Sequence, residues 1–98
     1  MHLDRISELL TGAKVRLEAF PVAALSVFGS MARGEANPGS DIDILVDFTA
    51  GASVGLFHYL ELKEILEEIF GCPVDLVTRD ALHPALREHI LTEARRVA

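Results

Sequence analysis

The alternating segment Asp41-Ile42-Asp43-Ile44-Leu45-Val46 constrains the fold of this 98-residue chain more than any other stretch. Successive side chains of a β-strand point to opposite faces of its sheet. The two aspartates therefore share one face, and the isoleucines and the valine occupy the other. We predict a strand over Asp41–Phe48 with its apolar face in a core and its carboxylates on the opposite side.

The segments around this strand predict a small α/β layer with a short sheet. Apolar residues at helical spacing, Pro and Gly punctuation and short apolar runs define the other elements. In chain order they are a helix over residues 2–19, strands over 23–28 and 41–48, a helix over 56–70, a strand over 74–78 and a final helix from Pro84 onward. Asp80 or His83 is expected to cap this final helix, and Arg95 and Arg96 to favour its dipole. Its inner face is expected to carry Leu86, Ile90, Ala94 and Val97.

Length and charge limit what a chain of this kind does. A chain of 98 residues corresponds to one domain, residues 1–98. Its net charge of −6 argues against independent binding to a nucleic-acid backbone, which needs a basic surface. The mean hydropathy of +0.31 is high for a short soluble chain, so we expect part of the apolar surface to meet a partner.

The N-terminus and the single cysteine exclude further classes. Asp4, Arg5 and Glu8 interrupt the start of the chain, so it does not resemble a signal peptide, and no apolar run approaches membrane-spanning length. We expect a cytoplasmic protein without membrane contact. Cys72 is the only cysteine, which excludes an internal disulfide and a multi-cysteine metal site.

The segment Gly29-Ser30-Met31-Ala32-Arg33-Gly34 is suited to holding phosphate. Gly29 lets the backbone approach a ligand closely, and the following N–H groups and the Ser30 hydroxyl can donate to anionic oxygens. An ordinary strand-to-helix turn is the alternative. Arg33 can pair with a triphosphate or with Asp41 or Glu35, and Ser40 is assigned a supporting role at the start of the next strand.

Three aspartates predict a metal site. Asp41 and Asp43 repel each other when they are buried side by side, and a divalent cation such as Mg²⁺ relieves that cost. A solvated strand end is the alternative for this pair alone. Asp75 is a charged residue inside an apolar strand, so it would be a third carboxylate if the two strands are neighbours. It would then also be placed to accept a proton from an attacking hydroxyl. Asp47 is expected to be solvated.

Together these motifs resemble the signature of the minimal nucleotidyltransferases of the DNA polymerase β superfamily. The matching residues are Gly29-Ser30-x-x-Arg33-Gly34, Ser40-Asp41-Ile42-Asp43-x-x-Val46 and Val74-Asp75-Leu76-Val77. The resemblance implies an α/β (α+β) nucleotidyltransferase fold with a short mixed sheet of three to four strands. It also implies Asp41 and Asp43 as ligands of two Mg²⁺ ions, Asp75 as the third carboxylate, and Gly29 and Ser30 as triphosphate contacts.

The same resemblance implies a reaction and a partner. The reaction is transfer of a nucleoside monophosphate, AMP from ATP, to a hydroxyl. Minimal nucleotidyltransferases are typically found with a helical HEPN-type toxin, and some act as antitoxins by adding AMP to a tyrosine of that toxin. Larger members of the superfamily add a helical domain that grips the acceptor, so we expect that surface to come here from another chain or from a second copy, which leaves a homo-oligomer open.

Two alternatives stay open at this point. One is transfer to a small molecule such as an aminoglycoside, for which Glu61, Glu64 and Glu68 could supply an acidic pocket unless they simply line a solvated helix face. The other is an antitoxin that neutralises its partner by contact alone. Tyr59 is expected to pack at a helix boundary rather than to be a target of self-modification.

Overall fold

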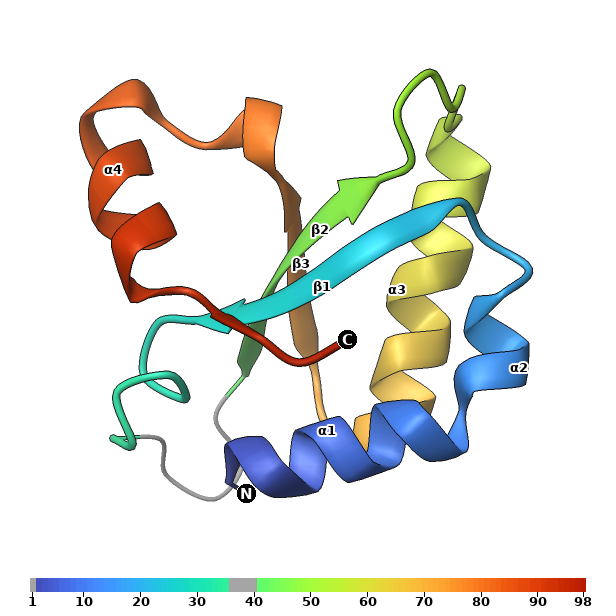
Figure 1. The fold of residues 1–98 in the computed structure, drawn as a ribbon, viewed down its shortest axis with the longest axis horizontal. Coiled ribbons are helices and arrows are strands. Elements are labelled where there is room, and N and C mark those ends of the chain that lie inside the picture. Colours follow the sequence, from blue (N-terminus) through green and yellow to red (C-terminus); the bar gives the residue numbers. More distant parts are fainter. Residues whose placement is uncertain (1, 36–40) are drawn as a thin grey trace.

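The structure is a computed structural model that describes residues 2–35 and 41–98 (Figure 1). The described helices and strands follow in chain order. They are α1 (Leu3–Gly12), α2 (Lys14–Leu17), β1 (Val22–Phe28), β2 (Ile42–Phe48), α3 (Leu56–Phe70), β3 (Val74–Thr78), the 3₁₀ turn η1 (Arg79–Ala81), α4 (Pro84–Glu93) and β4 (Arg95–Arg96). No helix in this part of the chain is long and apolar enough to cross a membrane.

The described strands form one mixed sheet in the order β3-β2-β1-β4. β2 runs parallel to β3, whereas β1 is antiparallel to both β2 and β4. The parallel pair is connected through α3, as a parallel connection requires. The predicted α/β fold class with a short mixed sheet is confirmed.

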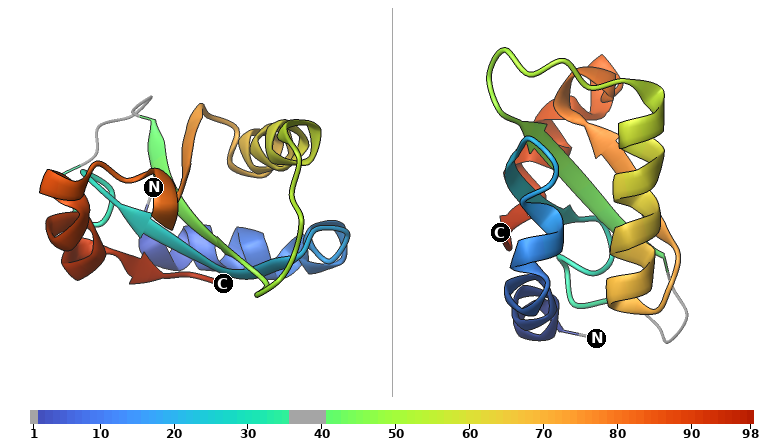
Figure 2. Two further views of the ribbon diagram at one scale, coloured as in Figure 1. Left: turned by 90° about the horizontal axis from the view of Figure 1, so that it is seen from above. Right: turned by 90° about the vertical axis from the view of Figure 1, so that its right-hand side faces the viewer.

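The two faces of the sheet are covered unequally. α1 and α3 cover the first face and enclose the main core, and α3 and α4 lie on opposite sides of the strands (Figures 1 and 2). The main core includes Ile6, Leu10, Leu25, Val27, Ile42, Ile44, Val46, Leu62, Leu66 and Leu76. The second face carries a smaller cluster of Phe28, Leu45 and Leu82, against which the end of α4 packs. Because this cluster is small, polar side chains can occupy the rest of the second face.

The helix predicted over residues 2–19 is interrupted, which corrects the sequence prediction. α1 ends at Gly12, Ala13 leaves the helical conformation with φ −103° and ψ 12°, and α2 is a single turn. Glycine is a poor helix former, so the break falls where continuing the helix is least favourable. The change of direction allows both Leu17 and Phe20 to be buried in the main core.

The end of the chain also differs from the prediction. α4 begins at Pro84 with His83 as its cap, as predicted, because the His83 Nδ1 accepts the Ala85 N–H at 3.1 Å. The helix ends at Glu93, however, and Arg95 and Arg96 form β4 instead of a last helical turn. The edge of β1 needs partners for its backbone groups, and pairing with β4 supplies them.

The shortened helix changes which side chains face inward. Leu86 is exposed, so its predicted place on the inner face of the final helix is wrong. Ile90, Leu91 and Ala94 pack on the smaller cluster, whereas Val97 packs against the main core from beyond β4. The helical spacing therefore predicts the inward position of Ile90 correctly but not that of Leu86, and the helix itself does not continue beyond Glu93.

Candidate active site

A single closed helical turn follows β1, at the position of the predicted phosphate-binding segment. The Arg33 N–H donates to the Gly29 carbonyl at 3.2 Å, which makes one turn of helix. The turn ends in a Schellman arrangement, in which the Glu35 N–H donates to Ser30 and the Gly34 N–H to Met31, with Gly34 at φ +73°. The buried Met31 side chain fixes this turn to the main core.

The donors at the start of this turn are of two kinds. The N–H groups of Ser30, Met31 and Ala32 donate to no acceptor in the described part of the chain, so they are available to an anion. The Gly29 N–H instead donates to the Glu93 carboxylate at 3.2 Å. The N–H groups without an acceptor in the described part of the chain therefore begin at Ser30, the residue after the glycine.

Gly29 has a steric role that its N–H does not reveal. Its φ of +72° lies in the left-handed region, and a Cβ at this position would overlap the carboxylate oxygen Oδ2 of Asp43. Only a residue without a side chain allows the turn to lie this close to Asp43. The candidate phosphate turn and the candidate metal ligand are thus in direct contact.

The parallel register of β2 and β3 places Asp43 opposite Asp75. Both belong to the sheet face opposite the main core, as their strand parity predicted. The pKa of Asp43 is raised, first by its partial burial and then by the negative charges of Asp75 and Asp41, with Arg33 acting in the opposite direction. A cation placed beside Asp43 would relieve this repulsion.

The third predicted ligand, Asp41, lies just before β2 and is exposed. Among the described residues, no group of three or more His, Cys, Asp or Glu side chains is placed to hold a metal ion without other ligands. Mg²⁺ is usually held by one or two carboxylates together with water and substrate phosphates. The open pair of Asp43 and Asp75, with Asp41 near it, fits that chemistry. Ser40 lies outside the described residues.

Arg33 is held between two glutamates. Its Nε donates to Glu35 at 2.9 Å, and its Nη1 donates to Glu93. The predicted pairing with Glu35 is therefore present, while Glu93 was missed. It is 60 residues away in the chain and occupies an ordinary helical position, so the sequence carries no signal for it. The pKa of Glu93 is lowered by Arg33 and, to a smaller extent, by the Gly29 N–H.

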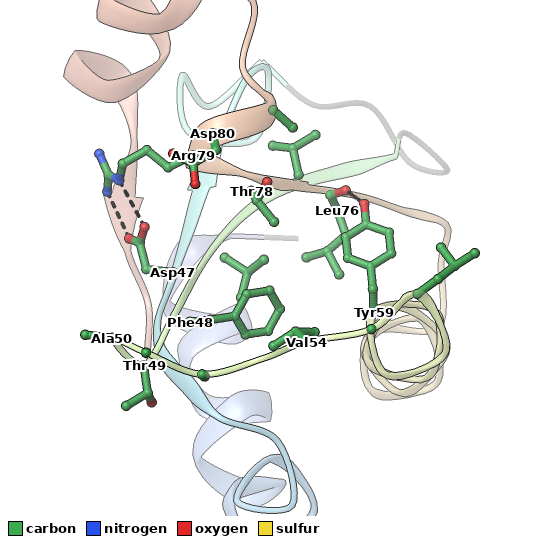
Figure 3. Close-up of a pocket in the computed structure, with 17 residues that line it drawn as sticks. Asp47, Phe48, Thr49, Ala50, Val54, Tyr59, Leu76, Thr78, Arg79 and Asp80 are labelled. Carbon is green, nitrogen blue, oxygen red and sulfur yellow. Dashed lines mark hydrogen bonds and ion pairs between the residues drawn. The ribbon is translucent and has the colours of Figure 1, made fainter.

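Asp47 is paired, which corrects the prediction that it is solvated. Arg79 donates to its two carboxylate oxygens at 3.0 and 2.9 Å, and this contact lowers the pKa of Asp47. The pair borders a cavity of about 710 Å³ at the carboxyl ends of β2 and β3, with Tyr59 on its other side (Figure 3). Asp43 and Asp75 lie nearer the opposite ends of the same strands.

The cavity and the acidic helix are separate from the carboxylate pair. Tyr59 packs against the main core and donates its hydroxyl to the Leu76 carbonyl, so the prediction of a packing role is confirmed. On α3, Glu68 pairs with Arg16 at 2.7 Å, and Glu61 and Glu64 are exposed. α3 covers the main-core face, so its acidic side chains do not converge on Asp43.

Comparisons with known proteins agree with this geometry. The sequence pattern of the family described as nucleotidyltransferase domain matches residues 7–97. The protein adenylyltransferase MntA of Thermococcus cleftensis is 44% identical over 94 residues, covering 95% of this chain and 93% of that protein. The chain therefore belongs to the nucleotidyltransferase domain family. The resemblance predicted from the motifs is confirmed, and with it the enzyme class of nucleotidyltransferase.

Two solved structures show the same fold. One, described as a "putative minimal nucleotidyltransferase", is 37% identical with a TM-score of 0.77, and the match covers 97% of this chain and 95% of that one. The other is the Shewanella oneidensis complex of a tri-AMPylated HEPN toxin with an MNT antitoxin, with 21% identity and a TM-score of 0.64. That match covers 94% of this chain and 71% of the other.

Proposed function

We propose that this chain transfers AMP from ATP to a tyrosine hydroxyl of a helical HEPN-type toxin and thereby acts as its antitoxin. The observation that carries the proposal is the placement of Asp43 opposite Asp75, directly beside the Gly29 turn. The 44% identity to a protein adenylyltransferase supports AMP as the group transferred. The tri-AMPylated toxin of the Shewanella oneidensis complex supports a protein acceptor.

The residues of the site divide into two groups. Asp41, Asp43 and Asp75 would hold two Mg²⁺ ions, whose charge would stabilise the attacking and leaving oxygens. The N–H groups from Ser30 onward, together with the Ser30 hydroxyl, cradle the triphosphate, and Gly29 permits its close approach to Asp43. Arg33, at the end of this turn, is proposed as a further contact to the phosphates, and Ser40, which lies outside the described residues, as a supporting residue.

The reaction is an in-line displacement at the α-phosphorus of ATP. The acceptor hydroxyl oxygen forms the new bond to phosphorus, the bond to the bridging oxygen of the β-phosphate breaks, and pyrophosphate leaves with that electron pair. The exposed carboxylate of Asp75 accepts the hydroxyl proton. Its exposure leaves room for a side chain of another protein to approach.

The test uses ATP with a radioactive label in its α-phosphate and measures which protein acquires that label. The protein is incubated with this ATP, Mg²⁺ and the product of a neighbouring gene that encodes a helical HEPN-type protein. We expect label on the partner, and loss of the label with Asp41→Asn or Asp43→Asn. Asp47→Asn is the matched control, because Asp47 shares the strand face of Asp43 but pairs with Arg79.

Each other outcome has a distinct meaning. Label that survives replacement of the partner's tyrosines by phenylalanine would refute the tyrosine acceptor. An Asp43→Asn protein that neutralises the toxin fully would support contact-only action and refute the enzymatic mechanism. A protein that binds no nucleoside triphosphate, even with Mg²⁺ and the partner present, would refute the proposal altogether.

A further inference from the structure

The last residue of α4 lies beside the end of β1. β4 pairs Arg95 with Val27 and Arg96 with Ser26 in an antiparallel register. Continued by two residues, this register brings Glu93 next to Gly29. The chain is already helical at Glu93, so the strand ladder has ended there, and the Glu93 side chain supplies an acceptor for the Gly29 N–H at 3.2 Å.

The second carboxylate oxygen of Glu93 accepts from Arg33. The Glu93 side chain is 12% exposed, whereas the other glutamate on Arg33, Glu35, is 64% exposed. Exposed ion pairs contribute little, and sheltered charge-assisted hydrogen bonds are stronger. Glu93 rather than Glu35 therefore determines where the Arg33 guanidinium lies.

Glu93 thus fastens both ends of the phosphate turn to α4. Gly29 begins the turn and lies against Asp43, and Arg33 lies near its end. α4 is itself anchored, because Ile90, Leu91 and Ala94 pack on the cluster of the second sheet face. The packed helix α4 therefore fixes, through Glu93, the positions of the turn residues that lie beside the reacting groups.

We propose that Glu93 is a positioning residue that holds Gly29 and Arg33 in the geometry required to bind the triphosphate of ATP. The inference rests on the proposed function, because that function is what places a triphosphate at this turn. Glu93 touches neither substrate nor metal in this role. It acts through the two residues that it binds.

A carboxylate at this place could instead occupy the phosphate site and compete with ATP. The direction of the Gly29 N–H argues against competition. The backbone groups of Leu25 form hydrogen bonds with Val97 and Ala98, at the edge of β1 that faces β4. Along a strand every second residue presents its backbone groups to the same edge, so those of Val27 and Gly29 also face this side. The Gly29 N–H is therefore an edge group of the ladder, while the N–H groups from Ser30 to Ala32 remain available to phosphate.

The test compares Glu93→Ala and Glu93→Gln with Glu88→Gln, an exposed glutamate on the same helix. Calorimetry measures the affinity for ATP with Mg²⁺, and NMR hydrogen exchange measures protection of the Gly29 amide against that of Val27. For Glu93→Ala we expect a loss of Gly29 protection and a roughly tenfold to hundredfold weaker ATP affinity, the order expected when sheltered charge-assisted hydrogen bonds are lost. Glu88→Gln should match the wild type in both measurements.

Glu93→Gln separates the two contacts, because its amide oxygen still accepts from Gly29 but its charge is gone. We expect retained Gly29 protection with an intermediate ATP affinity. In the transfer assay, the KM for ATP should rise while the KM for the acceptor stays unchanged, which a general loss of stability would not produce.

ATP affinity in Glu93→Ala equal to that of the wild type would overturn the positioning role. Tighter binding would overturn it in favour of competition with phosphate. A wild-type protein that binds ATP but labels no partner would refute the proposed acceptor and leave the Glu93 comparison intact. A wild-type protein that binds no ATP would overturn both proposals.

Discussion

Gly29→Ala and Gly34→Ala form a matched pair of substitutions at the two ends of the phosphate turn. Both glycines have a left-handed backbone, with φ of +72° and +73°. A Cβ at Gly34 would meet nothing within 4 Å, whereas a Cβ at Gly29 would overlap the Asp43 carboxylate. The two variants therefore share the backbone strain and differ in one contact.

The magnitudes follow from these two contributions. A left-handed conformation costs an alanine roughly 1–2 kcal/mol, and both variants should lose about this much stability. At Gly29 the Asp43 carboxylate must also rotate away, which costs about 0.5–1.5 kcal/mol for an off-rotamer side chain. Urea unfolding should therefore show Gly29→Ala to be the less stable of the two by that smaller amount.

The effect on transfer should be much larger than the difference in stability. Displacing Asp43 by about 1 Å can cost on the order of a hundredfold in rate, because catalysis depends on the position of the reacting groups. We expect Gly34→Ala to retain AMP transfer and Gly29→Ala to lose most of it, measured at a temperature at which both are folded. Equal activity in the two variants would refute the close approach of the turn to Asp43.

A double-mutant cycle isolates the contact itself. In an Asp43→Ala background the carboxylate is absent, and the nearest remaining atom of residue 43 would lie 3.5 Å from the new Cβ, an ordinary contact distance. Gly29→Ala should then cost no more stability than Gly34→Ala. A penalty that persists in this background would place its origin elsewhere than at Asp43.

Three further predictions concern stability. Asp75→Asn removes a negative charge that faces Asp43, so in urea unfolding at pH 7 with no divalent cation present it should stabilise the protein by roughly 0.2–1 kcal/mol, and it should abolish transfer. A destabilised variant would contradict the repulsion inferred from the raised pKa of Asp43. The pKa of Asp47 is lowered in the folded state, so its pair with Arg79 should stabilise the protein above the unfolded pKa of Asp47, and this stabilisation should be lost as the pH falls through the folded pKa. Because the Arg79 side chain is 42% exposed, Asp47→Asn should cost only about 0.5–1 kcal/mol at pH 7, and a stability difference from the wild type that does not shrink in acid would refute this. Gly12→Ala adds a Cβ that meets nothing within 4 Å in a helical residue, so it should raise the free energy of unfolding by about 0.5–1 kcal/mol, and a loss of stability would show that the break after α1 requires glycine.

Local patterns predicted the parts of the fold that local physics determines. The alternation from Asp41 onward assigned each side chain of β2 to its face. The helix predicted over residues 56–70 has these bounds, and it ends where Gly71 takes a left-handed conformation. The ends of the chain failed for a non-local reason. Arg95 and Arg96 suit a helix, but the unpaired edge of β1 outweighs that weak preference. Nothing within several residues of either arginine records this edge.

The candidate site divides in the same way. Asp43 and Asp75 were predictable because each interrupts an apolar strand, where a charge is unfavourable without a compensating role. Glu93 and the Asp47–Arg79 pair could not be predicted, because an acidic residue near the end of a helix or strand is most simply explained as a solvent-exposed side chain. Asp43 and Glu93 nevertheless depend on each other through Gly29, which must lack a side chain for one and present an N–H to the other. Two contacts therefore constrain Gly29, the one with Asp43 and the one with Glu93. The motif around Gly29 in the sequence indicates only the first.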